Sequence, residues 1–402
     1  MTLGERLASV NNRPSGFDYS RLGLAITVIA FHTVWVCYGD EGERAFWSGP
    51  FRPVFCAIVP SFFALSGFLV AGSLERNPLA AFLTLRAVRI FPALAVEVLI
   101  SALLIGPLLT SLTVNGYFSD PLFYHYLLNL IGDIHYQLPG VFENLPAANT
   151  VNIQLWTVPI ELECYILISI LALVGLTRKP RWFLVALLAA TIAVLGKEWV
   201  LGVFPVQNSR PANNLLVLSF LFGISLYMLR DRVTFNWPLF GFALCASWFC
   251  FMQVETTYLA PLPVAYATVF LGLLNPRKTL LVAGADYSYG MYLYGFPVQQ
   301  AMYYLFPECR AWYVNLIASL LLTGLLAYLS WTFLESRIHR KRMSAVHVVG
   351  WLIGRLNVNR ESLSCMMAQR SSALRRSNPP YSQTDCSVRE DSIANQPSST
   401  LG

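Results

Sequence analysis

Charged residues are scarce in this chain. They make up 12% of its 402 residues, about half the share found in soluble proteins, whereas hydrophobic residues make up 55%. A soluble fold of this composition would expose more apolar surface than its few charges could offset. The composition therefore excludes an ordinary soluble protein. Apolar runs of roughly twenty residues instead predict membrane-spanning helices, with a lipid bilayer as the surrounding medium.

Motifs for several other functions are missing. The eight cysteines include no CxxC pair, and several lie in apolar segments, where cysteine acts as a small hydrophobic residue. We therefore expect no metal site and no disulfide framework. The sequence also has no Walker loop and no GxGxxG motif. Its net charge of +6 is scattered between apolar runs, so we do not expect nucleic acid as a partner.

Ten apolar segments predict the architecture, an all-α polytopic membrane protein with about ten transmembrane helices. Many segments end in tryptophan or tyrosine, as expected where a helix meets the lipid headgroups. Residues 1–342 would form this membrane domain. The tail, residues 343–402, is rich in serine and poor in aromatic residues, which predicts a largely disordered cytoplasmic segment. The segments are roughly Leu22–Tyr38, Val54–Ser73, Ile90–Leu112, Trp156–Val174, Trp182–Leu195, Asn214–Leu229, Trp237–Phe251, Thr257–Leu274, Tyr287–Phe306 and Ala311–Phe333.

The positions of lysine and arginine predict the orientation. With the N-terminus in the cytoplasm, the ten segments place 23 of the 28 Lys and Arg residues on the cytoplasmic side and 5 on the other. Cytoplasmic loops of membrane proteins carry such an excess, so both termini are predicted to be cytoplasmic. The longest loop on the far side, residues 113–155, has no Lys or Arg. Its piece Tyr124–Ile131 is expected to form a short helix.

His32 lies inside the first predicted span, ten residues from its start, which is about 15 Å at 1.5 Å per residue. Ionisable groups at that depth are costly and usually face a polar interior. Arg21 precedes His32 by eleven residues, or about 20° more than three helical turns, so both side chains share one face. An anionic ligand held at Arg21 could present a reactive end at His32. The alternative is a neutral histidine hydrogen-bonded between helices.

Arg86 and Arg89 stand three residues apart at the start of the third predicted span. This spacing places both guanidinium groups on one side of a helix. Guanidinium groups bind phosphates in a bidentate manner, so the pair is a candidate phosphate site. Ordinary positive flanking of a cytoplasmic helix end explains the pair as well, and the spacing alone does not decide.

Carboxylates and tyrosines give weaker signals. Glu161 and Glu163 open the fourth span, where the helix dipole favours them and a carboxylate could orient an imidazole or bind a hydroxyl acceptor. Because they lie about 200° apart on a helix, at most one would face a shared site. Glu97, inside the third span, has no assigned role. Four tyrosines between residues 287 and 294 fit interface aromatics better than the lining of a polar cavity, and Glu335 fits a structural cap.

Six of these features, taken in order along the chain, resemble membrane-bound acyltransferase family 3, the bacterial O-acyltransferases that modify surface carbohydrates. The match runs from about residue 17 to residue 337. Each motif alone is loose, but six in the right order are specific. Arg21 with His32 resembles the R-x10-H signature, Pro60–Leu69 the FFxLSGFL segment, Arg86 with Arg89 the RxxR pair, Leu155–Glu161 the W-[ST]-L-x-x-E stretch, Tyr287–Pro297 the SYxxYLxHxP segment, and Glu335 the final glutamate.

The resemblance implies a ten-helix core in a bacterial inner membrane. It also implies a cytosolic acyl-CoA donor and a carbohydrate hydroxyl as acceptor, often on the far side of the membrane, without identifying that acceptor. One departure stands out, because Gly295 occupies a position where the family often has a histidine. The role of that second histidine is absent here or supplied by another group, such as Gln299.

The predicted function is that of an O-acyltransferase, most readily an O-acetyltransferase that uses acetyl-CoA as its donor. Arg86 and Arg89, with Arg21, would hold the phosphates of coenzyme A. His32 would act as general base on the acceptor hydroxyl or carry the acyl group briefly. Glu161 would orient the acceptor or His32. No metal is required in this scheme.

Two other classes of function stay open at this stage. A transporter that exports an anionic or lipid-linked saccharide would also need ionisable groups near the midplane and a polar outer loop. A sensor or scaffold without catalysis is the third class. The sequence predicts neither the identity of the saccharide nor the oligomeric state.

Overall fold

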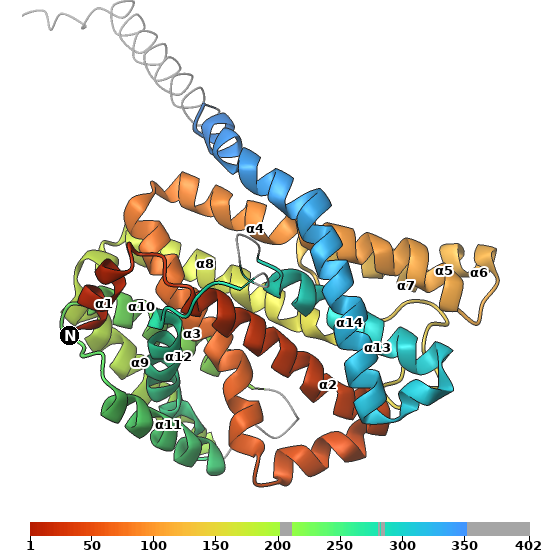
Figure 1. Cartoon of the computed structure of the whole chain (residues 1–402), viewed down its shortest axis with the longest axis horizontal. Coiled ribbons are helices and arrows are strands. Elements are labelled where there is room, and N and C mark those ends of the chain that lie inside the picture. The colour runs from red at the N-terminus through yellow and green to blue at the C-terminus, as the bar shows by residue number, and fades with distance from the viewer. Residues whose placement is uncertain (202–210, 280–281, 283–285, 352–402) are drawn as a thin grey trace, which may run out of the picture. The chain divides into compact units, whose positions relative to one another are not determined.

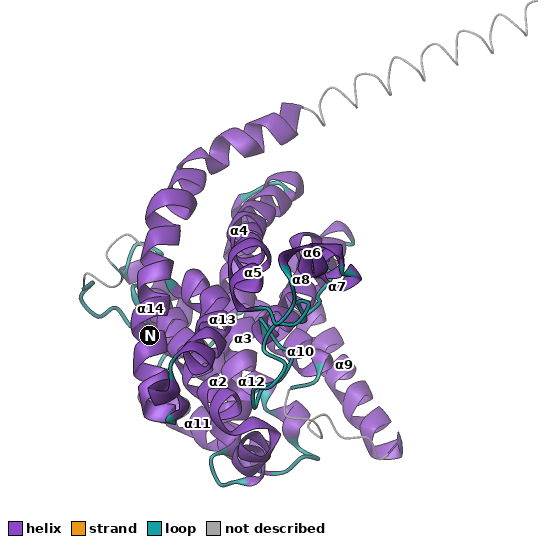
Figure 2. Ribbon diagram, turned by 90° about the vertical axis from the view of Figure 1, so that its right-hand side faces the viewer, coloured by secondary structure: helices purple, strands orange, loops and turns teal. Residues whose placement is uncertain are grey.

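The computed structural model describes residues 1–201, 211–279, 282 and 286–351. In this part of the chain the regular elements are helices, and no strand is present (Figure 2). Residues 1–349 form one unit, which holds every element discussed below. Helix continues through the expected domain boundary at residue 342 as far as Trp351. The expected disorder of the tail concerns residues that mostly lie outside the described ones, and it stays a prediction.

Ten longer helices each overlap one of the ten apolar segments, which confirms the all-α polytopic membrane fold (Figure 1). Within the described residues, six helical stretches are long and apolar enough to cross a membrane, and three further apolar helices are shorter. The longer helices are α2 (Gly16–Ser48), α3 (Arg52–Arg76), α4 (Leu79–Ile100), α8 (Thr157–Leu173), α9 (Pro180–Leu201), α10 (Asn213–Met228), α11 (Trp237–Met252), α12 (Pro261–Leu273), α13 (Ser288–Leu305) and α14 (Trp312–Ser330).

Short helices join the longer ones. α1 (Leu3–Ser9) precedes α2, and α5 (Gly106–Leu109) continues α4 after a π-helical turn at Ser101–Ile105. The long loop between α5 and α8 contains α6 (Val114–Ser119) and α7 (Pro121–Leu127), and α7 runs on into a 3-10 turn at Leu128–Ile131. The short helix expected at Tyr124–Ile131 is therefore present.

Two helix boundaries differ from the sequence prediction in ways that matter for function. α2 continues to Ser48, but Gly39 has a φ of 65° and kinks it, so the straight part ends where the apolar segment Leu22–Tyr38 ends. α4 begins at Leu79, about three turns before the predicted start at Ile90. Arg86 and Arg89 consequently lie within a formed helix, which fixes the directions of their side chains.

Helices α3 and α10 pack backbone against backbone through glycine. A Cβ atom at Gly67 of α3 would lie 2.0 Å from the carbonyl oxygen of Phe220, and one at Gly223 of α10 would lie 2.1 Å from that of Ala64. Small residues at such contacts let helices approach closely, which drives helix association in membranes. α11 and α12 also contact α3, so α3 is at the centre of one part of the bundle.

Helix α2 connects that part to the rest of the bundle. It contacts α3 and α12, which belong to that part, and it also contacts α13 and α14. α4 in turn contacts α3, α8 and α13. The predicted site residues are distributed over α2, α4 and α8, so this packing brings residues distant in the sequence near one another.

The glycine contact gives a stability prediction. Gly67→Ala and Gly223→Ala should each lower the melting temperature of the detergent-solubilised protein, because the added methyl group overpacks the contact and overpacking costs about 1–3 kcal/mol. Gly324→Ala in α14 is the matched control, since a Cβ there meets nothing within 4 Å and alanine favours a helix. Equal melting temperatures for all three variants would show that the close contact is absent.

Candidate active site

The three arginines expected from the sequence meet in one cavity, here called the arginine cavity. Arg21 reaches it from α2, and Arg86 and Arg89 reach it from α4. Glu161 of α8 and Tyr292 of α13 also line it. The cavity contains about 920 Å³ of space not filled by protein atoms, part of it open to the surroundings. Four of the five predicted site residues are thus brought together.

Asp286 is an additional residue of this site that the sequence analysis did not identify. Its carboxylate oxygen Oδ2 lies 2.7 Å from Nη2 of Arg89 and 3.2 Å from Nη1 of Arg21. Ser288 donates a hydrogen bond to the other oxygen, Oδ1. Burial raises the pKa of the Asp286 carboxyl, but the guanidinium groups of Arg89 and Arg21 outweigh it and lower that pKa below its ordinary value. Asp286 is therefore a carboxylate that holds two arginines side by side.

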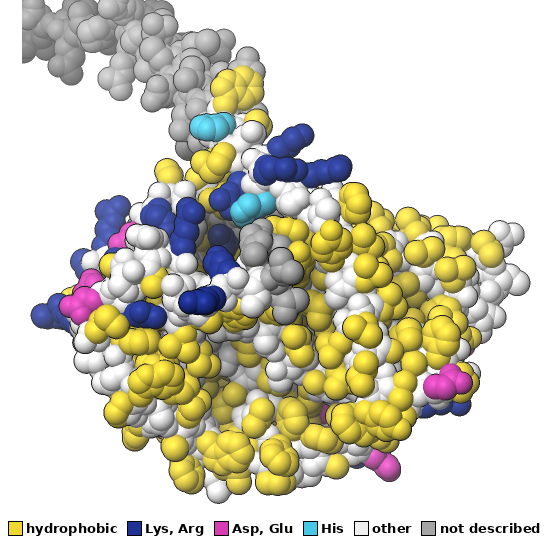
Figure 3. Space-filling view, viewed as in Figure 1, with side chains coloured by type: hydrophobic (Ala, Val, Ile, Leu, Met, Phe, Trp, Pro, Cys, Tyr) yellow, Lys and Arg dark blue, Asp and Glu magenta, His cyan; other side chains and the backbone are white. Residues whose placement is uncertain are grey.

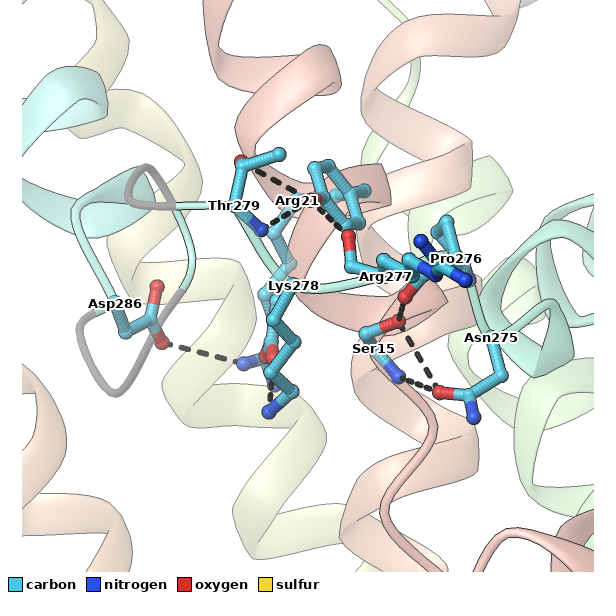
Figure 4. A network of polar contacts seen from close by, with 10 residues as sticks. Ser15, Arg21, Asn275, Pro276, Arg277, Lys278, Thr279 and Asp286 are labelled. Carbon is cyan, nitrogen blue, oxygen red and sulfur yellow. Dashed lines mark hydrogen bonds and ion pairs between the residues drawn. The ribbon is translucent and has the colours of Figure 1, made fainter.

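The segment before Asp286 is fastened to the start of α2 (Figure 4). The hydroxyl of Ser15 donates a hydrogen bond of 2.6 Å to the carbonyl of Pro276, and the backbone N–H of Ser15 donates one of 3.1 Å to Oδ1 of Asn275. The hydroxyl of Tyr19 donates to the carbonyl of Arg277 at 2.9 Å. These contacts fix residues 275–279 beside the helix that carries Arg21.

Arg86 differs from the other two arginines. It makes no ion pair and no hydrogen bond with any residue that the structure describes, and its Nε atom is buried without a partner. The guanidinium lies 5.9 Å from the centroid of the Phe82 ring and 6.0 Å from that of Tyr165, which are favourable cation–π distances. A buried, unpaired donor is costly unless a ligand satisfies it, so Arg86 is the group best prepared to bind an anion.

Glu161 faces the arginines, and Glu163 does not. The hydroxyl of Tyr165, one turn further along α8, donates a hydrogen bond to Glu161, whereas the side chain of Glu163 is exposed. The two carboxylates therefore point in different directions, as their spacing predicted. Glu161 was expected to orient the acceptor or His32, but the structure places Glu161 in the arginine cavity and does not bring it into one cavity with His32.

His32 lines a second cavity, here called the histidine cavity. Three tryptophans, Trp35, Trp47 and Trp156, line it together with Gln154. The His32 imidazole makes no hydrogen bond with a described residue. Its ring contacts instead are with Phe31 and with Phe296, whose ring meets it edge-on at 5.3 Å. The arrangement seen is therefore an imidazole open to a cavity rather than one hydrogen-bonded between helices.

The two cavities are neighbours, because Val59 and Tyr292 line both of them. The hydroxyl of Tyr292 donates to the carbonyl of Gln154 at 2.8 Å and lies 2.7 Å from Oγ1 of Thr157. These bonds hold Tyr292 between the arginines and His32. Tyr289 lines the arginine cavity too. The preference for interface aromatics is thus wrong for Tyr289 and Tyr292, since they face inward.

A third cavity, here called the basic vestibule, shares all three arginines with the arginine cavity. Arg13, Arg76 and Arg342 line the vestibule and not the arginine cavity. Glu335, expected to be a structural cap, lines it as well and accepts a hydrogen bond of 3.0 Å from Ser330. The three cavities form a series that runs from the vestibule past the arginines to His32.

Gln299, the candidate replacement for a second histidine, lies outside this series. Its side chain is fully buried, and Nε2 donates to the carbonyl of Ile29 at 2.8 Å and to Oγ1 of Thr33 at 2.6 Å. These bonds join α13 to α2 one turn from His32. Glu97 is also fully buried, accepts a hydrogen bond of 2.7 Å from Ser101, and lines none of the three cavities. In the described residues no cluster of His, Cys, Asp and Glu could hold a metal ion.

Comparisons with known proteins define the class of this chain. The sequence model of the acyltransferase domain family matches residues 15–335, so the chain belongs to that family, membrane-bound acyltransferase family 3. It is similar to a protein named O-acetyl transferase from Shigella phage Sf6, with 24% identity over 80% of this chain and 95% of the relative. It is also similar to Nodulation protein 10 of Rhizobium leguminosarum bv. viciae, with 28% identity over 83% of this chain and 95% of the relative. No solved structure matches it.

Membership in this family decides between the classes of function that the sequence left open. The matched region contains every residue of the arginine cavity and the histidine cavity. The chain is a multi-pass membrane O-acyltransferase, and the transporter and scaffold hypotheses are set aside.

The ion pairs of Asp286 give a second stability prediction. Asp286→Asn removes the negative charge that pairs with both Arg21 and Arg89, whose side chains are 27% and 28% exposed. Hydrogen bonds to charged groups typically contribute about 1.5–3 kcal/mol, so the melting temperature in detergent should fall clearly. Asp18→Asn is the control, because its pair with Lys278 is longer, at 3.6 Å, and more exposed. Equal shifts for both variants would contradict a special role for Asp286.

Proposed function

We propose that this protein is an O-acetyltransferase of the bacterial inner membrane, which moves an acetyl group from acetyl-CoA to a hydroxyl of a carbohydrate or lipid-linked saccharide. The observation that carries the proposal is the series of cavities, with an arginine cluster at one end and an unpaired imidazole at the other. A polyanionic donor needs a positively charged binding site, and a neutral hydroxyl acceptor needs a site with a base, so the two ends of the cavity series suit the two substrates. A relative named O-acetyl transferase supports acetyl as the transferred group.

Acetyl-CoA is proposed to bind from the arginine side. Arg86 would contact the phosphates of coenzyme A directly, while Arg21 and Arg89, held by Asp286, would add donors from the other side. Guanidinium groups suit phosphates because of their planar, bidentate geometry. The pantetheine arm is about 15–20 Å long when extended. That length supports a donor whose phosphates stay at the arginines while its thioester lies near His32.

His32 is proposed to act as the general base. One of its ring nitrogens would take the proton of the acceptor hydroxyl as the oxygen attacks the thioester carbonyl carbon. The carbon–sulfur bond then breaks, and the leaving thiolate takes the proton back from the imidazolium. The products are the acetyl ester and free coenzyme A. An alternative mechanism, in which His32 first carries the acetyl group itself, also requires His32.

Glu161 is proposed to position the reacting end of the donor. It lies in the arginine cavity beside Tyr165 and across from Arg86. A carboxylate there can accept hydrogen bonds from the amide N–H groups of a pantetheine arm. The sequence predicted that Glu161 orients the acceptor or His32. In this proposal Glu161 acts on them indirectly, by positioning the donor.

The histidine cavity is proposed to receive the saccharide. Its tryptophans offer flat apolar faces, and Glu43 and Gln154 add polar groups. Pockets with apolar walls and a few polar groups are typical of small-molecule sites. The excess of Lys and Arg predicts that the basic vestibule faces the cytoplasm, with both termini on that side. The acceptor would then meet His32 from the opposite side.

His32 variants test the proposed chemistry. His32→Ala and His32→Asn should each reduce acetyl transfer by about 10²–10⁴-fold, the usual contribution of a general base. Protein level and melting temperature should stay near wild type, because the imidazole makes no hydrogen bond to a described residue. Transfer can be followed with acetyl-CoA labelled in the acetyl group. An active His32→Asn enzyme would show that the base lies elsewhere.

Arg86 and Glu161 variants should separate binding from transfer. Arg86→Lys keeps the charge but loses the planar fork, so the KM for acetyl-CoA should rise about tenfold or more. The KM for the acceptor should not change. Glu161→Gln keeps an oxygen that can accept from the pantetheine arm, so coenzyme A should still bind, whereas the lost charge misplaces the thioester and should lower kcat. An Arg86 variant that alters the acceptor KM and spares the donor would place coenzyme A elsewhere.

A further inference from the structure

The basic vestibule contains an outer group of arginines that the proposed function does not use. Arg13 lies between α1 and α2, Arg76 in the last turn of α3, and Arg342 in the helix that continues from α14. All three side chains are exposed. They line the vestibule together with the inner arginines of the arginine cavity, but they do not reach that cavity. The vestibule therefore has an inner and an outer group of guanidinium groups.

None of the outer arginines forms a direct ion pair with a described residue, although Glu75 lies beside Arg76 and feels its charge. Other cations at this end of the bundle do, since Arg230 pairs with Glu75 at 3.3 Å and Lys278 with Asp18 at 3.6 Å. Arg342 contacts His339 of its own helix. In the face shown in Figure 3, most of the Lys and Arg side chains gather in one region, whereas hydrophobic side chains cover much of the rest. Unpaired like charges around a hollow concentrate anions there.

Coenzyme A carries its phosphates in two places. A pyrophosphate lies between the pantetheine arm and adenosine, and a phosphate monoester lies on the ribose. If the thioester end points toward His32 and the pyrophosphate lies at the inner arginines, the ribose phosphate falls on the outer side of them. The two groups of phosphate thus match the two groups of arginine in number and order.

We propose that Arg13, Arg76 and Arg342 form a binding site for the ribose phosphate monoester of the donor, and so select coenzyme A over its 3′-dephospho form. This inference rests on the proposed function, because it requires coenzyme A in the arginine cavity. It assigns a specificity role to three residues outside that cavity. Each exposed contact contributes little alone, and the group acts as a set.

The test measures binding of two ligands to the full-length protein in nanodiscs of neutral lipid. Wild type should bind coenzyme A about tenfold more tightly than 3′-dephospho-coenzyme A. The double variant Arg13→Ala/Arg76→Ala should weaken coenzyme A binding about tenfold and leave the affinity for the dephospho form unchanged, so that the ratio falls to near one. Unchanged binding of the dephospho form also shows that the variant is folded.

Arg178→Ala is the matched control. Arg178 is also exposed, and it lines a crevice that borders the vestibule at Asn77 without itself lining the vestibule, so its loss should change neither affinity. Wild type that binds both ligands equally would overturn the outer site and leave the proposed donor site standing. If the double variant weakens the binding of both ligands equally, the outer arginines only attract anions in general, and the ribose phosphate site is overturned as well. Failure of both ligands to bind wild type would overturn the proposed donor together with this inference.

Discussion

One carboxylate between two guanidinium groups governs the architecture of the site. Arg21 and Arg89 come from different helices and would repel each other in a partly buried setting, where charges are weakly screened. Asp286 lies within 3.2 Å of both and compensates only one of their two charges. Arg86 adds a third positive charge without a partner among the described residues. Glu161 in the same cavity is a second carboxylate, so three guanidinium groups meet two carboxylates. The cluster therefore keeps one positive charge that an anionic ligand can neutralise, which makes it suitable for binding a phosphate.

The position of Tyr292 explains how one protein can separate two different substrates. Its hydroxyl is fixed by Gln154 and Thr157, and its ring borders both the arginine cavity and the histidine cavity. In the proposed reaction, a charged donor would be favoured on one side and an uncharged hydroxyl acceptor on the other. Only the slender acyl-pantetheine arm would need to pass between them, so the two substrates meet at His32 without sharing a binding surface.

The sequence predicted the helices and the arginines well, because apolar run length and motif spacing are local properties. It missed Asp286, since the contact with Arg21 joins residues 265 positions apart and no local pattern reports such a pair. It also favoured the wrong environment for Tyr289 and Tyr292, because aromatic residues near a helix end have the same pattern whether they face lipid or a cavity. Glu161 was assigned to the correct helix face, but its neighbours depend on how α4 packs against α8.

In the proposed reaction the donor enters at the basic end of the bundle, and the acetyl group leaves at the other end. Inside-out and right-side-out membrane vesicles that contain the protein can be supplied with acetyl-CoA labelled in the acetyl group, which does not cross the bilayer. The measured quantity is label bound as an ester to saccharide. We expect the saccharide to be labelled in inside-out vesicles. In right-side-out vesicles, labelling should not exceed that of control vesicles that lack the protein. Equal labelling in both orientations would contradict the account.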